Sequence, residues 1–357
     1  MNEVKNAPKV LMIGPGRNVM GGISTVVNSY FDLGLGEKVH LRYIASMEDG
    51  SKLKKLRVAA KAYLQFKRCL KDFDIVHVHM AAQASFSRKS MFIRAAKKAG
   101  KKIIIHQHAA DFDDFFFKQS DEKKRLEIKK IFGMADKVIV LSEEWEKFFG
   151  KYVCDARKIE VFHNGVILPN YQKTDYEDHN VLFLGRLGER KGTYDLLKVI
   201  PNVLRKVPDA MFFLGGDGEV EQCRKLAEKT GIAEHVSFLG WVRDAEKEKF
   251  LKKCSVFILP SYHEGMPMAV LESMAYGLAT ISTNAGGIPQ IIEQGINGYR
   301  IEAGDLKEME NVLIRVLTNT EERERIGNAA RIRIAEKFNA ERNINELSAL
   351  YREILYC

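Results

Sequence analysis

Residues 180–218 read NVLFLGRLGERKGTYDLLKVIPNVLRKVPDAMFFLGGDG, and this stretch decides the fold. Two short runs rich in apolar and aromatic residues, 180–186 and 210–216, flank a longer helical stretch. Each run ends in glycine and polar residues, which is typical of a strand that leads into a loop. A strand, a helix and a second strand in this order predict a parallel sheet whose faces are covered by helices.

The same alternation continues along most of the chain, with a polar break at 169–179. We therefore expect two doubly wound, Rossmann-like α/β domains, at 1–168 and 169–335, and a length of 357 residues suits two such domains. From about residue 321 the pattern is helical, with no further strand expected. The predicted strands are 9–14, 39–44, 74–79, 101–108, 137–142 and 159–164 before the break, and 180–186, 210–216, 235–241, 256–261 and 279–284 after it.

Composition narrows the class of protein. The five cysteines are scattered without C-x-x-C spacing, which argues against a disulfide framework or a zinc site and favours the reducing cytoplasm. We expect neither a signal peptide nor a membrane-spanning helix. The net charge of +9 favours an anionic partner, either a phosphorylated small molecule or an acidic membrane surface, unless the surplus lysines only make the surface soluble. No nucleic-acid-binding motif is present, so nucleic acid is not an expected partner.

Unusual residues gather where the predicted strands end. In open parallel sheets, ligands bind beyond the carboxyl ends of the strands. In the first domain, Gly21 and Gly22 follow the first strand and His108 closes the fourth. In the second domain, five strands in turn are followed by Arg186, 215–218, Trp241, Glu264 and 286–287. We predict an active site in a cleft between the two domains.

The stretch HEGMPMAVLESMAYG at 263–277 is the most specific signal. Glu264 falls in a loop, Pro267 suits the first turn of a helix, and Glu272 lies eight positions after Glu264, inside that helix. The two carboxylates would then be roughly 10 Å apart, which suits two parts of one extended ligand better than a shared metal. Free amides at the helix start can bind phosphate. The alternative is an exposed helix residue and an ordinary turn residue.

Two further loops favour an anionic ligand. LGRLGERKG at 184–192 holds Arg186 and Lys191, and together they can neutralise a diphosphate, although loop cations are often only solvated. GPGRNVMGGIST at 14–25 lacks the G-x-G-x-x-G spacing of a dinucleotide fingerprint. Its Gly21–Gly22 pair either admits a phosphate or sugar close to the backbone or simply forms a tight turn.

Histidines, paired acids and one basic helix complete the candidates. Period-two alternation places His106 and His108 on one strand face, where His108 can bind a sugar hydroxyl or a phosphate, or be structural; we interpret His77 and His79 as structural. Two D-x-D triplets, at 72–74 and 111–113, lack supporting ligands, and we assign no metal.

The basic segment 51–71 either docks on an anionic membrane or packs its apolar face on the first sheet. That face comprises Leu53, Leu56, Ala60, Tyr63 and Leu64.

Taken together, these motifs resemble those of a retaining glycosyltransferase of family 4, with the two-domain GT-B architecture. The E-x7-E element from Glu264 to Glu272 carries most of the resemblance, and Arg186 with Lys191, GDG at 216–218, FLGWV at 238–242, HNGV at 163–166 and GGIP at 286–289 fall in the family's order. The resemblance implies catalytic roles for His108, Glu264, Arg186 and Lys191. It implies donor-binding roles for Gly21, Gly22, Gly216, Trp241, Val242, Gly265, Met266, Pro267, Met268 and Glu272.

The resemblance also implies an activity. It suggests metal-independent transfer of a hexose from a nucleotide diphosphate donor, with UDP as the family-level choice, to a glycan or lipid-linked acceptor in surface polysaccharide synthesis. A last helix at 336–357 would cross back to the first domain. Two positions depart from the family pattern: Gln290 stands where Glu is common after GGIP, and 162–165 lacks the usual proline.

Three other activities are compatible with parts of this pattern. An oxidoreductase would share the Rossmann-like units, but the fingerprint glycines and the acidic ribose partner are missing. A nucleotide-sugar epimerase would have the same two-domain form. A catalytically silent protein that only binds a nucleotide sugar would lack part of the set that includes Glu264, Lys191 and His108, whereas this chain retains it.

Overall fold

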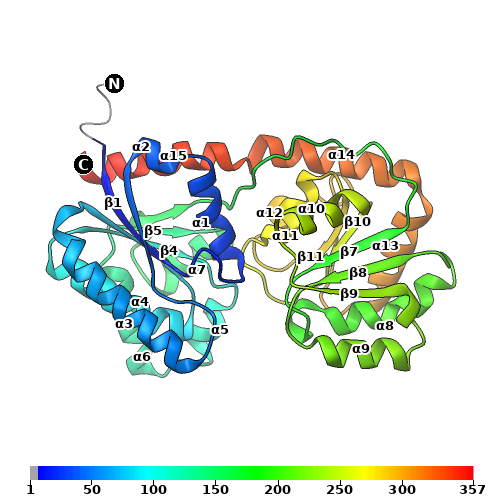
Figure 1. The fold of residues 1–357 in the computed structure, drawn as a ribbon, viewed down its shortest axis with the longest axis horizontal. Coiled ribbons are helices and arrows are strands. Elements are labelled where there is room, and N and C mark those ends of the chain that lie inside the picture. Colours follow the sequence, from blue (N-terminus) through cyan, green and yellow to red (C-terminus); the bar gives the residue numbers. More distant parts are fainter. Residues whose placement is uncertain (1–6, 357) are drawn as a thin grey trace. The chain divides into compact units, whose positions relative to one another are not determined.

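The structure is a computed structural model that describes residues 7–356. Contacts divide the chain into two compact units (Figure 1). Unit 1 contains the residues up to Gly165 together with those from Ala340 onward, and unit 2 is Val166–Asn339. The chain therefore leaves unit 1 once and returns to it at its C-terminal end.

Unit 1 is built on a six-stranded parallel sheet of order β2-β1-β3-β4-β5-β6. Its central strands β1, β3 and β4 are buried almost throughout, because helices cover both faces of a parallel sheet. All six strands predicted for this half of the chain are present. The bounds are β1 Lys9–Gly14, β2 His40–Ala45, β3 Ile75–Met80, β4 Lys102–Gln107, β5 Lys137–Val140 and β6 Ile159–Val161.

The two faces of this sheet differ in character. One carries an apolar core in which Phe66, Phe92 and Phe149 pack on strand residues such as Val78 and Ile105. The other carries the histidines of β3 and β4 and faces the C-terminal helix, as the bond between His77 and Tyr351 shows. The helices are α1 Gly22–Asp32, α2 Leu35–Lys38, α3 Lys52–Cys69, α4 Gln83–Lys98, α5 Phe112–Phe117, α6 Glu122–Gly133, α7 Glu143–Tyr152 and α15 Ala340–Tyr356.

The C-terminal helix α15 is an integral part of unit 1. Leu347 and Tyr351 are fully buried, and the Tyr351 hydroxyl lies 2.6 Å from Nδ1 of His77 in β3. Asn343 donates through Nδ2 to the carbonyl of His163 at 2.8 Å. The predicted return of the last helix to the first domain is therefore confirmed.

Unit 2 repeats the architecture with the parallel order β12-β11-β10-β7-β8-β9. Its strands are β7 Asn180–Leu184, β8 Met211–Gly215, β9 Val236–Gly240, β10 Val256–Leu259, β11 Ala279–Thr283 and β12 Tyr299–Ile301. Its helices are α8 Thr193–Leu204, α9 Val220–Lys229, α10 Asp244–Lys253, α11 Met268–Ala275, α12 Ile288–Ile291, α13 Leu306–Thr318 and α14 Thr320–Lys337. Strand β12 was not predicted; it pairs with β11 over three residues, too few to show an alternating pattern.

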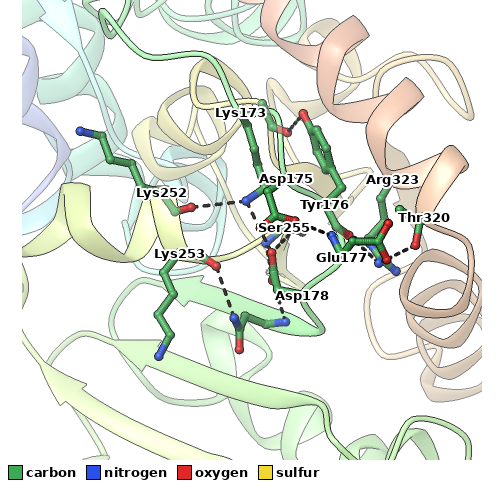
Figure 2. A network of polar contacts seen from close by, with 12 residues as sticks. Lys173, Asp175, Tyr176, Glu177, Asp178, Lys252, Lys253, Ser255, Thr320 and Arg323 are labelled. Atoms are coloured by element: carbon green, nitrogen blue, oxygen red, sulfur yellow. Dashed lines mark hydrogen bonds and ion pairs between the residues drawn. The ribbon is translucent and has the colours of Figure 1, made fainter.

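The polar segment before β7 is fixed to unit 2 by buried contacts (Figure 2). The Asp178 carboxylate accepts from the amide and the hydroxyl of Ser255 and lies 3.5 Å from Nζ of Lys173. The fully buried Arg323 donates to the carbonyl of Tyr176 through Nε at 3.0 Å and Nη2 at 2.6 Å. Buried charges need such partners, so this segment is an ordered part of unit 2.

Across residues 7–356, the helices are all too short or too polar to pass through a bilayer.

Candidate active site

The loops that follow five neighbouring strands of unit 2 lie along one edge of its sheet. The strands β11, β10, β7, β8 and β9 are consecutive in the sheet order and parallel, so their carboxyl ends meet at the same edge. The sequence-predicted residues follow these strands: Gly286, Glu264, Arg186, Gly216 and Trp241. The structure thus brings the unit 2 candidates together, as the position of each after a strand suggested.

Lys191 and Glu264 form the most buried ion pair of this edge. Nζ of Lys191 contacts Oε1 of Glu264, and the two side chains are 14% and 6% exposed. The loops that carry them are also joined through their backbones, because the Tyr262 amide donates to the Arg190 carbonyl at 2.9 Å. Gly192 lies so close to the Pro260 carbonyl that no Cβ would fit there. The two loops therefore form one rigid support for a paired cation and carboxylate.

Arg186 precedes Lys191 in the chain, but its side chain is far more exposed to solvent. Its side chain is 68% exposed, and Nη1 lies 3.7 Å from Oδ2 of Asp217 in the next loop. Gly216, which precedes Asp217, packs against the Gly185 carbonyl, where a Cβ would collide. An exposed guanidinium beside a single partly exposed carboxylate can turn to an incoming anion at little cost.

The second carboxylate of the E-x7-E element is also paired with a lysine. Glu272 lies inside α11, and its Oε1 is 2.6 Å from Nζ of Lys247 in α10. Pro267 was expected in the first turn of this helix, but the helix begins at Met268 and Pro267 precedes it with ψ 117°. The expectation was wrong by one residue, because the extended ψ of Pro267 ends the loop rather than starting the helix.

The remaining unit 2 candidates are mostly backbone or packing positions. Met266, Met268 and Val242 are buried, whereas Trp241 is half-buried. The Gly265 carbonyl accepts from the Gly287 amide at 2.6 Å, which joins the loops after β10 and β11.

In unit 1, the glycine pair lies after β1 as predicted. Gly21 has φ 142°, a conformation that favours glycine, and a Cβ at this position would meet nothing within 4 Å. Gly22 is the first residue of α1. The backbone at this helix start is therefore open on the Gly21 side, which suits close approach of a phosphate or sugar.

His108, the other unit 1 candidate, belongs to a cluster of four histidines. His77 and His79 on β3 and His106 and His108 at the end of β4 lie on one face of the sheet, and β3 pairs with β4 so that His79 is opposite His106. Neighbouring ring centroids are 4.1 to 5.1 Å apart for the pairs His106–His108, His77–His79, His79–His106 and His79–His108. His77, His79 and His106 are buried, and His108 is half-buried.

Burial keeps these imidazoles neutral. It lowers the pKa of His108 to about 3, assisted by the positive charge of Lys89, and lowers the pKa of His77 to about 3 with a contribution from His108. The pKa values of His79 and His106 also lie well below the ordinary value, for the same reason. Lys89 itself is fully buried, and its Nζ has no hydrogen-bond partner among residues 7–356.

Ring nitrogens of His77, His79 and His106 lie within 4.8 Å of one another, close enough to raise the question of a metal. Among the described residues, no carboxylate or thiolate joins this group. A divalent ion here would add charge to a buried site without compensation. We therefore assign these histidines no metal.

Three features of the site were not predicted from the sequence. His79 was interpreted as structural, yet its Nδ1 lies 2.9 Å from Nε2 of His108. The partners of Glu272 and Arg186, which are Lys247 and Asp217, were also missed. The shared face of His79 and His108 could have been inferred from strand alternation, but the pairing register of β3 with β4 could not.

The basic helix α3 exposes the leucines that the sequence singled out. Leu53, Leu56 and Leu64 are 56%, 68% and 58% exposed, whereas Ala59, Ala62, Phe66 and Cys69 form the buried face. The helix does pack on the core of unit 1, as one of the two alternatives expected, but it does so through residues such as Ala62 and Phe66 and not through these leucines. Only Tyr63 of that group packs against the core.

Comparison with known families assigns both halves of the chain. Residues 30–168 match the family model described as Glycosyltransferase Family 4, and residues 169–333 match the model described as Glycosyl transferases group 1.

Curated relatives agree with these models. The chain is 27% identical over 320 residues to the UDP-Gal:alpha-D-GlcNAc-diphosphoundecaprenol alpha-1,3-galactosyltransferase of Escherichia coli, covering 83% of this chain and 80% of that protein. It is 33% identical to the phosphatidyl-myo-inositol mannosyltransferase of Mycobacterium leprae, covering 71% and 67%. Among solved structures, HepE of Anabaena in complex with UDP and glucose matches with a TM-score of 0.78 at 16% identity, covering 97% and 100%. The last likeness concerns the fold alone.

Proposed function

Because this chain belongs to glycosyltransferase family 4 and has the GT-B fold, we propose that it transfers a hexose from a UDP-sugar to a lipid-linked or glycan acceptor, with retention and without a metal. The observation that carries this proposal is the buried pair of Lys191 and Glu264 at the carboxyl edge of the unit 2 sheet. A cation and a carboxylate in contact suit a ligand that carries phosphate next to sugar hydroxyls.

The charges support a division of labour within the donor site. Lys191 and Arg186 neutralise the diphosphate, and Glu264 accepts hydrogen bonds from hydroxyls of the transferred sugar. Before the donor arrives, Glu264 balances the charge of the largely buried Lys191. The diphosphate then takes over part of this role, which frees the carboxylate for the sugar.

The reaction builds negative charge on the leaving group. The bond between the anomeric carbon and the β-phosphate oxygen breaks, and its electron pair goes to that oxygen. Lys191, Arg186 and the first amides of α11 stabilise this charge, as a preorganised set of donors does in an oxyanion hole. The acceptor hydroxyl bonds to the anomeric carbon on the same face, and its proton passes to the departing phosphate oxygen.

The other residues position the donor. Glu272 accepts from the ribose hydroxyls, and Trp241 and Val242 frame the base. Gly216 and the backbone of 265–268 lie against the phosphates and sugar. In unit 1, Gly21 and Gly22 admit the phosphate, and His108 contacts the sugar and the β-phosphate.

The acceptor proposal rests on the relatives and on α3. The Escherichia coli relative is named for a diphosphoundecaprenol acceptor, a lipid-linked diphosphate. In this chain, α3 presents Leu53, Leu56 and Leu64 among lysines and arginines, with no acidic residue in the helix. Such a face binds anionic membranes, which would place the enzyme at the cytoplasmic side of the plasma membrane during surface polysaccharide synthesis.

The proposal is tested by purified protein with UDP-galactose, UDP-glucose, UDP-N-acetylglucosamine and GDP-mannose. A bound donor raises the unfolding temperature by mass action, and we expect a UDP-sugar to do so. With GlcNAc-diphosphoundecaprenol as acceptor, that donor should yield UDP and an α-linked product, equally with EDTA and with magnesium. If the donor is isomerised in the absence of acceptor, the protein is an epimerase. If the donor binds but no product forms, the protein is catalytically silent. A strict dependence of transfer on magnesium would indicate a different mechanism.

A further inference from the structure

We propose that His79 is a positioning residue that fixes His108 as the tautomer with its proton on Nδ1, so that His108 offers an N–H group to the donor. The role of His108 toward a sugar or phosphate rests on the proposed function, but its tautomer does not. This role differs from packing because it requires a hydrogen-bond donor in His79 that bonds one ring nitrogen of His108, and not only a side chain of suitable size.

The geometry of the pair is that of a hydrogen bond between one ring nitrogen of each imidazole. Nδ1 of His79 lies 2.9 Å from Nε2 of His108. The ring centroids are 5.1 Å apart and the ring planes are inclined to each other by 28°. β3 and β4 pair in parallel, which holds both backbones in place.

Only one proton can lie between the two nitrogens when both rings are neutral, and burial keeps them neutral. If His108 donated this proton, His79 would carry its own proton on Nε2. That atom is buried and has no hydrogen-bond partner among residues 7–356. A buried N–H group without an acceptor costs about 1–3 kcal/mol. The arrangement that avoids this has His79 donating through Nδ1.

His108 is then defined at both nitrogens. Its Nε2 accepts from His79, so its proton must be on Nδ1. Since Nε2 is engaged with His79, Nδ1 is the ring nitrogen of His108 that remains for a ligand. A neutral N–H donor suits phosphate and hydroxyl oxygens, whereas a bare nitrogen would repel a phosphate. His79 therefore determines whether His108 attracts a phosphate or hydroxyl oxygen through an N–H group or repels it through a bare nitrogen.

Two substitutions separate this role from packing. In His79→Asn, the side-chain amide can donate from about the place of Nδ1, whereas His79→Leu has a similar size and no donor. We expect His79→Leu to lower kcat for UDP release from UDP-galactose about 10–100-fold with little change in KM, because a misoriented contact is lost in the transition state. His79→Asn should stay within about threefold of the unaltered protein. His77→Leu is the control, since His77 is equally buried on the same strand and is bonded to Tyr351 instead.

A spectroscopic measurement tests the tautomer without any turnover. In chelator-treated protein carrying ¹⁵N-labelled histidine, the ring nitrogens of His108, assigned with His108→Gln, should show a protonated Nδ1 and a bare Nε2 at pH 7. The signals should shift toward a mixture of tautomers in His79→Leu and not in His77→Leu. A protonated Nε2 of His108, or unchanged kcat in a folded His79→Leu protein, would overturn the proposal. If the unaltered protein releases no UDP, the proposed function fails while the nitrogen signals still decide the tautomer.

Discussion

At the scale of single residues, the Lys191–Glu264 pair couples stability to activity. Each side chain is the main charge partner of the other in a poorly exposed place. Lys191→Met and Glu264→Gln should each lower the free energy of unfolding by about 2 kcal/mol, because each leaves the other charged side chain of a partly buried ion pair without its charge partner. The double variant should recover most of this loss while sugar transfer stays reduced about 100-fold or more. Chemical denaturation and UDP release measure the two effects.

The control for this cycle is Lys225→Met, which removes a positive charge from an exposed position of α9 in the same unit. It should leave both quantities unchanged. Additive losses of stability in the double variant would show that the two side chains do not depend on each other.

The buried histidines predict a particular pH dependence. His106 has a folded pKa well below its ordinary value of 6.5 because it is buried. Below about pH 6.5 the unfolded chain therefore binds more protons than the folded protein does. The free energy of unfolding is then at its full value above about pH 6.5 and falls toward acid pH, by up to about 1.4 kcal/mol per pH unit for each such histidine. His106→Leu should make the decline in unfolding free energy between pH 7 and pH 5 shallower, by up to about one proton toward the acid end. An unchanged slope would contradict this.

Residue identities were predictable where the local pattern determined them. Glu264, Arg186 and Trp241 each follow a strand end, and a parallel sheet brings such positions to one edge whatever the details. The partners Lys247, Asp217 and His79 depend on which strands and helices are neighbours and in what register. Sequence alternation gives the face of a strand but not the residue opposite it.

At the scale of elements, α3 has two apolar sides with different uses. Ala59, Ala62 and Phe66 pack inward, which leaves Leu53, Leu56 and Leu64 as an exposed row among basic residues. Replacing these three leucines by Gln should lower binding to phosphatidylglycerol vesicles more than tenfold, since each buried leucine contributes roughly 1.5 kcal/mol or more. Co-sedimentation with the vesicles measures this binding.

The matched control is Leu126→Gln, at a leucine of α6 that is 61% exposed in the same unit. It should bind vesicles as the unaltered protein does. Neutral phosphatidylcholine vesicles should retain little of either protein, because the basic residues of α3 require an anionic surface. Equal binding by the triple variant would remove α3 from the membrane proposal.

Element prediction failed where an element is short or defined by its neighbours. The expected strands 101–108 and 180–186 are shortened to Lys102–Gln107 and Asn180–Leu184, since the final residues turn into site loops. Strand β12 holds three residues and exists because it pairs with β11. Helix α11 starts after Pro267 rather than at it. In each case the tertiary contacts determine the boundary, whereas propensity gives only the type of element.

At the scale of the whole molecule, two parallel sheets were predictable from the alternation of strands and helices, but the strand orders and the sixth strand of the second sheet were not. Polar residues without periodicity interrupt the alternation of strands and helices at 169–179. The buried role of that segment, through Asp178 and Arg323, depends on side chains that are distant in sequence. The expected cleft between the domains stays a prediction.

The return of the chain to unit 1 makes the stability of that unit depend on residues from the far end of the sequence. Leu347 in α15 is fully buried, so Leu347→Ala should cost about 2–5 kcal/mol through lost burial and a cavity. Amides of β1, β3 and β4 should then exchange hydrogen faster, while those of β7, β8 and β10 keep their rates. Leu313→Ala in α13, equally buried in unit 2, should give the reverse pattern. Uniform acceleration in both units would show that they unfold as one cooperative body, because separate cores otherwise confine each defect to its own sheet.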